Sequence, residues 1–190
     1  MIIDDEKKFV FICVAKTAST SMRRRFGYFE DPPPHIYHMF LKDILDKNPH
    51  TKDYFKFGFV RNPYDRLYST YINLKYEGHL WATALKAKRT FEEFVLDFEG
   101  SKYSDYIHLQ PQINYLINGE SIGLDYVGRF ENLNDDFRDI EKILGLSHVK
   151  LKKERYSRTY PLDPKFYTNS MRGVVCEIYG EDFERFGYEK

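Results

Sequence analysis

Residues 9–26, "FVFICVAKTASTSMRRRF", place a long apolar run directly before a polar and basic segment. The first seven residues of this stretch are apolar, a composition typical of a strand buried on both faces of a parallel sheet. A lysine and five small residues come next, and four of these five carry a hydroxyl group. Met22 and Phe26 then lie four residues apart, which predicts a helix over residues 19–29. The stretch therefore predicts a strand, a tight turn and a helix in direct succession.

A turn of this kind is suited to binding an anion. The first turn of a helix offers unpaired backbone N–H groups and a partial positive charge. Lys16 adds a full charge, and further donors come from the hydroxyl groups of Thr17, Ser19, Thr20 and Ser21. From these residues alone, a strand followed by a helix with a Ser/Thr-rich start, and no ligand, is an equally good interpretation.

A nucleotide-binding P-loop is the first alternative for this turn. Its pattern, G-x-x-x-x-G-K-[ST], would require glycine at positions 10 and 15 if Lys16 and Thr17 were its last two residues. The sequence has Val10 and Ala15 at these positions. The absence of both glycines argues against a standard ATP or GTP loop.

A second strand and helix are predicted in "YFKFGFVRNPYDRLYSTYINLKY", residues 54–76. Residues 54–60 form the strand, Asn62 is a suitable N-cap and Pro63 fits the first helical position. Arg61 would lie at the carboxyl end of the strand, where open α/β sheets bind ligands. Ser69 lies two turns into the helix. Because arginine suits bidentate phosphate binding, these residues predict a second anionic group on the same ligand.

The remaining pattern alternates in the same way. In one predicted helix, Phe137, Ile140, Ile143 and Leu144 should share a buried face, and Gly145 should end the helix. Strands alternating with helices favour an α/β fold with a largely parallel sheet flanked by helices, and a single domain over residues 1–190. Besides the segments above, we expect a strand at 124–130 and helices at 38–48, 90–98, 134–146 and 167–188.

The composition limits the possible partners. Lys and Arg number 29, as do Asp and Glu, so the formal net charge is zero and a general affinity for nucleic acid is not expected. No apolar segment approaches the roughly 20 residues that span a membrane. The start, "MIIDDEKK", is charged where a signal peptide would be apolar, which predicts a cytoplasmic protein.

The metal-binding residue types are too dispersed for a site. Cys13 and Cys176 are the two cysteines of the chain, and both are interpreted as small buried thiols. Histidine, cysteine and aspartate do not occur together at ligand spacing, so no metal is expected.

Four motifs resemble the carbohydrate-type sulfotransferases, sulfotransferase family 2. They are "AKTASTS" (15–21), "FVRNPYDRLYSTY" (59–71), "DYVGRFENLNDDF" (125–137) and "IYGEDFERFGY" (178–188). The resemblance covers residues 9–188, and the first two motifs are the specific ones. "KTASTS" is close to the branch that sulfates uronic acid 2-hydroxyls in heparan and dermatan chains, whereas "YFKFGFVRNPYDRL" is closer to bacterial members.

The resemblance implies a P-loop-like α/β fold without a working Walker A motif and 3′-phosphoadenosine 5′-phosphosulfate (PAPS) as the donor. Residues 16–21, namely Lys16, Thr17, Ala18, Ser19, Thr20 and Ser21, would bind the 5′-phosphosulfate. Arg61 and Ser69 would bind the 3′-phosphate. Arg158, in a basic loop, would close over the adenine and the 3′-phosphate. Lys16 would also face the oxygen that leaves sulfur.

Transfer to a hydroxyl requires a base, and histidine suits neutral pH. The family commonly has a histidine shortly before the second strand, at the start of a helix. "HMFLKDIL" (38–45) matches this placement, so His38 is the predicted base and His35 the alternative. The acceptor is expected to be a saccharide and to contact residues 77–116. There Gln110 and Gln112 are candidates for hydrogen bonds to sugar hydroxyls, although both are equally typical of helix boundaries.

The chain departs from the family in several ways. Ala15 stands where proline is usual, while Ala18 is shared with the uronosyl branch. Golgi members carry a membrane anchor, a stem and extra cysteines. This sequence shows none of these features, so we expect a compact bacterial or viral enzyme. Glu131 is expected to brace the helix that follows it, and Arg23–Arg25 to face mostly solvent. Two alternatives remain: an ATP-dependent kinase, and a non-catalytic protein of this fold that binds PAPS or adenosine 3′,5′-bisphosphate.

Overall fold

The computed structural model describes residues 1–29, 38–76, 90–97, 106–151 and 166–190. The chain divides into two compact units, one of residues Met1–Arg61 and Gln112–Arg155, the other of residues Asn62–Pro111 and Tyr156–Lys190. The single domain expected from the sequence stays a prediction, and the two units are described in turn.

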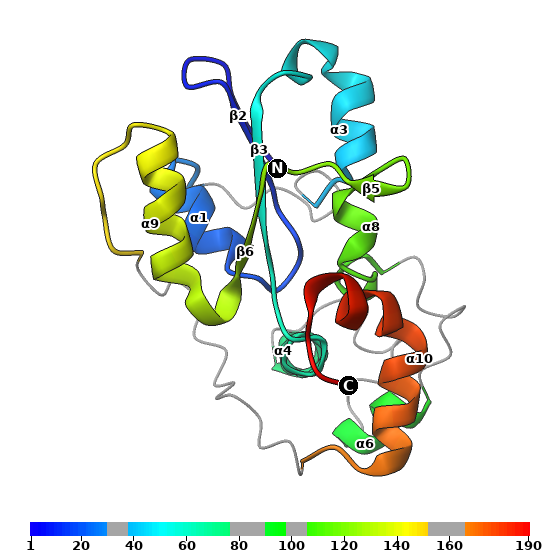
Figure 1. Cartoon of the computed structure of the whole chain (residues 1–190). Helices are drawn as coiled ribbons and strands as arrows, with labels where there is room; N and C mark the ends of the chain where they lie inside the picture. Colours follow the sequence, from blue (N-terminus) through cyan, green and yellow to red (C-terminus); the bar gives the residue numbers. More distant parts are fainter. Residues whose placement is uncertain (30–37, 77–89, 98–105, 152–165) are drawn as a thin grey trace. The chain divides into compact units, whose positions relative to one another are not determined.

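The first unit is built on a four-stranded sheet in the order β1-β2-β3-β6 (Figure 1). β2 and β3 pair in parallel, as do β3 and β6, which confirms an α/β arrangement with a largely parallel sheet. β1, which the sequence did not predict, adds an antiparallel edge. The strands are β1 (Ile2–Asp4), β2 (Phe9–Ile12), β3 (Phe55–Val60) and β6 (Tyr126–Arg129).

Helices cover both faces of this sheet (Figure 1). α1 (Ser19–Arg25) and α9 (Leu133–Ile143) lie together on one face, and α3 (Leu41–Lys47) and α8 (Ile113–Leu116) on the other. Each predicted helix in this unit is present but shorter than predicted. The unit also contains the 3₁₀ turns η1 (Pro49–Thr51) and η3 (Phe130–Asn132) and a small hairpin of β4 (Ile117–Asn118) and β5 (Ser121–Ile122).

Phenylalanine rings fill the space between the sheet and the two helices α1 and α9. Phe11 and Phe57 are neighbours across β2 and β3, and their rings stack with centroids 5.1 Å apart. Phe26 bridges to α9 through an edge contact of 6.0 Å with Phe137. Gly128 of β6 leaves room for Phe59, because a Cβ at this position would lie 2.4 Å from Cε1 of that ring. The excess of aromatic residues thus serves the core.

α9 confirms most of its predicted face. Phe137 and Ile140 are fully buried, and Leu144 packs against the same cluster. Ile143 was expected there too, but it is 56% exposed. It lies about 60° from Ile140 around the helix, since successive residues turn by about 100°, on the side away from Phe137 and Leu144. Gly145, at φ 64°, follows the end of the helix as predicted.

The second unit contains α4 (Pro63–Tyr76), α6 (Phe91–Leu96), η2 (Ile107–Leu109) and α10 (Asn169–Phe186). Asn62 caps α4 as predicted, because its Oδ1 accepts the N–H of Tyr64 at 3.0 Å. Thr90 and Glu93 form a capping box on α6. α10 changes direction at Tyr179, whose φ of −112° is not helical.

A buried arginine joins these elements. The side chain of Arg66 is 1% exposed. Its guanidinium donates to the carbonyl oxygens of His108 at 3.2 Å and Gln110 at 2.7 Å, and it lies over the ring of Tyr179. The segment that follows η2 is therefore fixed to α4 by charge-assisted hydrogen bonds.

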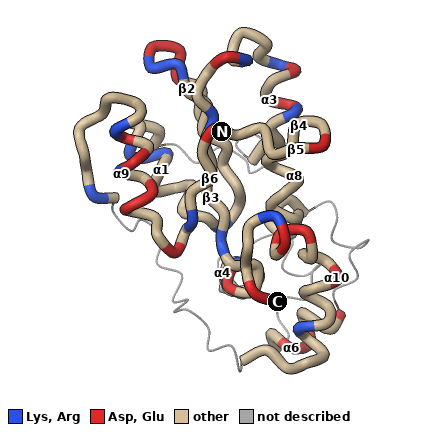
Figure 2. Tube along the Cα trace, viewed as in Figure 1, with Lys and Arg blue, Asp and Glu red and all other residues tan. Residues whose placement is uncertain are grey.

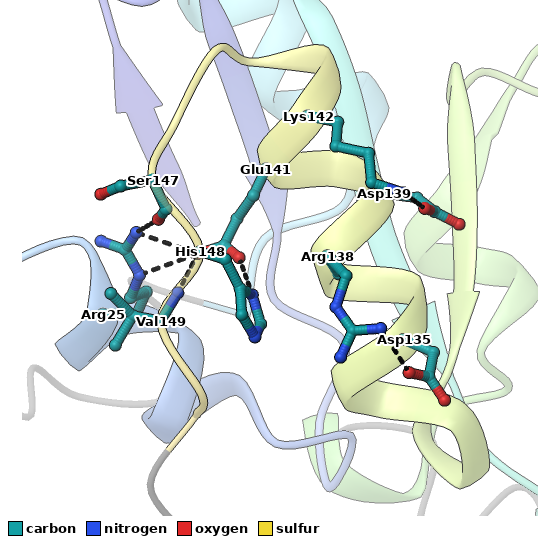
Figure 3. A network of polar contacts seen from close by, with 9 residues as sticks. All are labelled: Arg25, Asp135, Arg138, Asp139, Glu141, Lys142, Ser147, His148 and Val149. Carbon is teal, nitrogen blue, oxygen red and sulfur yellow. Dashed lines mark hydrogen bonds and ion pairs between the residues drawn. The ribbon is translucent and has the colours of Figure 1, made fainter.

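A polar network ties α1 to α9 in the first unit (Figure 3). The carboxylate of Glu141, 1% exposed, accepts hydrogen bonds from Arg25 Nη2 at 2.9 Å and from His148 Nδ1 at 2.7 Å. It also accepts the N–H of Val149 at 3.2 Å. The expectation that the three arginines mostly face solvent is wrong for Arg23, which is 4% exposed, and for Arg25, which this carboxylate holds.

We expect the substitution Glu141→Gln to destabilise the chain by about 2 kcal/mol, since it removes the charge from several buried hydrogen bonds. Urea denaturation measures this loss. Asp139→Asn is the matched control, because Asp139 pairs with Lys142 in solvent with side chains 55% and 69% exposed. Its effect should stay below about 0.5 kcal/mol. Equal effects of the two substitutions would contradict a structural role for the network.

Candidate active site

The turn after β2 is held by its own hydroxyl groups. Thr17 Oγ1 and Ser19 Oγ both donate to the carbonyl oxygen of Val14, at 2.9 and 2.6 Å. Lys16 and Ala18 have φ angles of 66° and 68°, in the left-handed region that favours glycine. Such conformations persist only where the surroundings enforce them. Thr17 and Ser19 were predicted to donate their hydroxyl groups to an anion, and in the structure both donate to the turn itself.

The rest of the predicted loop lies at the start of α1. Thr20 and Ser21 belong to its first turn, and both side chains are half-buried. Ala18 occupies the N-cap position and gives the helix no side-chain hydrogen bond. Backbone N–H groups and the partly exposed Lys16 are thus the features of this turn that suit an anion.

Arg61 lies beside this turn, at the carboxyl end of β3. Its side chain is 4% exposed, and Nη1 donates to the carbonyl oxygen of Lys16 at 3.4 Å. The centre of its guanidinium lies 4.2 Å from the ring centroid of Phe130. The structure therefore brings Lys16 and Arg61 together at one edge of the sheet, as the sequence predicted for two parallel strands.

Gln112 has a contact that the sequence did not predict. Its Oε1 accepts the backbone N–H of Arg61 at 2.8 Å, and its Nε2 donates to the backbone carbonyl of Arg61 at 2.9 Å. The residue is fully buried. In the sequence, the one hint of this role is a glutamine directly before the run "INYL" (113–116). The sequence does not indicate which group the glutamine contacts.

His38 lies in the segment that leads to α3, and its side chain reaches the residue that follows β2. It is 3% exposed, and its Nδ1 is 2.6 Å from the carbonyl oxygen of Cys13. Because a carbonyl only accepts, Nδ1 carries the hydrogen, so in the neutral ring Nε2 is the basic nitrogen. The ring of Tyr115 meets the imidazole edge-on with centroids 6.5 Å apart.

Burial lowers the pKa of His38 from its usual value of 6.5 to about 3. The hydrogen bond to Cys13 opposes this shift, while the positive charges of Lys16 and Arg23 add to it. His38 is therefore neutral at physiological pH, the form in which a histidine accepts a proton.

Two further predicted residues belong to the second unit. Ser69 is 1% exposed on α4. Gln110 directly follows η2, and its backbone carbonyl accepts a hydrogen bond from Arg66. That Ser69 and Arg61 bind one phosphate stays a prediction, as does a contact of Gln110 with the acceptor. His35 and Arg158 lie outside the described residues.

Outside this site, three further properties of the described residues bear on function: the charge pattern, the grouping of metal-binding residue types, and the length and polarity of the helices. Lysine and arginine alternate with acidic residues along α3, α9 and α10 (Figure 2), so anion binding depends on local groups. Within the described ranges, no three His, Cys, Asp or Glu side chains gather closely enough to hold a metal ion. The helices of that part of the chain are too short or too polar to cross a membrane.

Comparison with known proteins gives a consistent result. The model of the sulfotransferase family matches residues 1–189. Carbohydrate sulfotransferase 11 from Rattus norvegicus and the protein of that name from Mus musculus are each 23% identical to this chain over an alignment 235 positions long. Each alignment covers 99% of this chain and 66% of the relative. The Danio rerio protein of the same name is 24% identical over 76% of this chain and 53% of its own length. The chain thus spans just under two thirds of its rodent relatives. No solved structure matches it.

We expect His38 to make stability depend on pH. Unfolding restores its usual pKa near 6.5, so its contribution is complete above that pH and is lost as the pH falls towards 3. Between pH 7 and pH 5 the loss should be about 2 kcal/mol. In urea denaturation, the difference in unfolding free energy between the wild type and His38→Gln should decrease by this amount. A difference that stays constant over this range would show that the histidine is not buried as a neutral ring.

Proposed function

Because the chain belongs to the sulfotransferase family, whose model matches residues 1–189, we propose that it transfers a sulfuryl group from PAPS to an acceptor hydroxyl. The observation that carries the proposal is the grouping of Lys16, Arg61 and His38 around the carboxyl ends of β2 and β3. Three relatives are carbohydrate sulfotransferases by name, which supports a saccharide as the acceptor.

The donor would be bound at two anionic groups. The turn of residues 16–21 offers backbone N–H groups and the charge of Lys16 to the 5′-phosphosulfate. Arg61 offers a planar guanidinium to the 3′-phosphate, with Ser69 as a second donor from α4. Two separate anchors would distinguish PAPS from nucleotides that lack a 3′-phosphate.

The chemical step is an in-line displacement at sulfur. The acceptor oxygen forms a bond to sulfur while the bond from sulfur to the phosphate oxygen breaks, and its electron pair stays on the phosphate. Lys16 neutralises the charge that develops there. The acceptor proton moves to Nε2 of His38, and adenosine 3′,5′-bisphosphate leaves. Most of the acceleration comes from holding the reacting groups in line.

The environment of His38 supports its role as the base. The hydrogen bond from Nδ1 to Cys13 fixes the tautomer that presents a basic Nε2, and it stabilises the imidazolium that forms. A pKa near 3 makes the ring a weak base in the unliganded chain. Bound phosphate and sulfate groups would raise this pKa, because nearby negative charge favours the protonated form.

The alternatives are a kinase and a non-catalytic binding protein of the same fold. Val10 and Ala15, where a Walker A motif has glycine, disfavour the kinase. The curated relatives named above are animal proteins. A bacterial or viral origin and a cytoplasmic location remain predictions from the sequence.

Thermal unfolding distinguishes these functions. Adenosine 3′,5′-bisphosphate without magnesium should stabilise the chain, by about 2.7 kcal/mol at a concentration 100 times its dissociation constant. Stabilisation by Mg-ATP and not by the bisphosphate would favour the kinase. Binding of the bisphosphate, without transfer of labelled sulfate from PAPS to any of a panel of saccharides, would favour the non-catalytic protein.

Substitution of the predicted base should separate turnover from binding. His38→Gln should lower kcat by roughly 10²- to 10⁴-fold, because the proton then has no acceptor, while affinity for the bisphosphate changes little. His50→Gln is the matched control, since His50 is 55% exposed and contacts Asp5. Lys16→Ala should weaken both binding and turnover. Wild-type turnover in His38→Gln would exclude His38 as the base.

A further inference from the structure

We infer that Gln112 positions Arg61 for recognition of the 3′-phosphate, so that selectivity for this phosphate depends on a residue that does not touch it. The inference rests on the proposed function, because it takes Arg61 as the 3′-phosphate ligand. It is carried by the two hydrogen bonds between the Gln112 amide and the Arg61 backbone, at 2.8 and 2.9 Å.

The side chain of Gln112 pairs with the backbone just beyond the end of β3. The pairing of β3 with β6 ends at Val60 and Arg129, and the pairing with β2 ends at Gly58. Arg61 is the next residue and is still buried, and its backbone N–H and carbonyl oxygen both bond to the Gln112 amide. One amide side chain supplies an acceptor and a donor together, as a peptide group would. The backbone of Arg61 is thereby held where the strand ends.

A second contact holds the other end of the same residue. The guanidinium of Arg61 lies on the ring of Phe130, and Nη1 reaches the carbonyl oxygen of Lys16 over a long 3.4 Å. With the backbone fixed by Gln112 and the side chain supported by Phe130, few rotamers remain. An arginine already ordered in this way loses less freedom when a phosphate binds.

Gln112 itself is on a rigid support. It precedes α8, whose Tyr115 and Leu116 are fully buried. The Cδ2 atom of Leu116 would lie 3.4 Å from a Cβ at Gly58, so α8 packs directly on β3. Tyr115 also meets Phe40 edge-on, with centroids 5.2 Å apart. The amide is therefore presented to Arg61 by packed side chains, which is how a supporting residue keeps a binding group in place.

The test compares two nucleotides that differ in one group. Affinities for adenosine 3′,5′-bisphosphate and adenosine 5′-phosphate are measured by calorimetry for the wild type, Gln112→Met, Arg61→Ala and the double variant. Gln112→Met should weaken bisphosphate binding by roughly tenfold or more, within the range that supporting residues show. Binding of the monophosphate should change by less than about twofold. In the Arg61→Ala background, Gln112→Met should not change the ratio of the two affinities further, because the guanidinium that Gln112 positions is gone.

Two further variants keep the experiment decisive. Gln112→Glu preserves size and the bond from the Arg61 N–H, so it should fold if Gln112→Met does not. It should also lower the ratio of the two affinities, since a carboxylate cannot donate to the Arg61 carbonyl and repels the 3′-phosphate. Asn118→Met makes a comparable change at an exposed position of β4 and should leave the ratio unaltered.

The outcomes separate the inference from the proposed function. A wild-type preference for the bisphosphate that persists in folded Gln112 variants would overturn the inference and leave the proposed function standing. An equal loss of both nucleotides would show a general structural role and also overturn it. A wild type that binds the bisphosphate no better than the monophosphate would overturn the proposed donor site, and the inference with it.

Discussion

Buried backbone groups at the carboxyl ends of β2 and β3 impose the constraint on which the site depends. There the chain leaves the sheet ladder while it is still surrounded by protein, and a buried peptide group without a partner is costly. Side chains meet this demand. Thr17 and Ser19 donate to Val14, and His38 donates to Cys13. Gln112 serves both backbone groups of Arg61.

The same contacts that complete the strands set up the proposed chemistry. The bond to Cys13 fixes the tautomer of His38. The hydroxyl groups of Thr17 and Ser19, which donate to the Val14 carbonyl oxygen, hold the turn with its two positive φ angles. A turn rich in glycine would reach this conformation without help. Here serine and threonine supply the restraint instead, so the turn forms with a lysine and an alanine at its two left-handed positions.

Much of the frame could be predicted from the sequence, because it depends on local pattern. Apolar runs gave three strands of the sheet, Asn62 and Pro63 gave the start of α4, and two motifs gave the family. Partners distant in sequence could not be predicted. Arg25 reads as a solvated residue until Glu141, 116 positions later, is placed beside it. Gln112 reads as a helix boundary until the backbone of Arg61 is known.

The two arginines of "RNPYDRL" show why position in a motif does not fix a role. Arg61 and Arg66 lie five residues apart, and both are almost fully buried. The guanidinium of Arg66 donates to the carbonyl oxygens of His108 and Gln110, so its charge serves the fold of the second unit. At Arg61, the backbone is held by Gln112, and the guanidinium lies on Phe130 and reaches the carbonyl oxygen of Lys16. Burial alone would assign both residues to structure. The partners of the Arg66 guanidinium assign this residue to structure, because a charge that already serves two carbonyl groups has little left to offer a phosphate. For Arg61, the role of phosphate ligand stays a proposal.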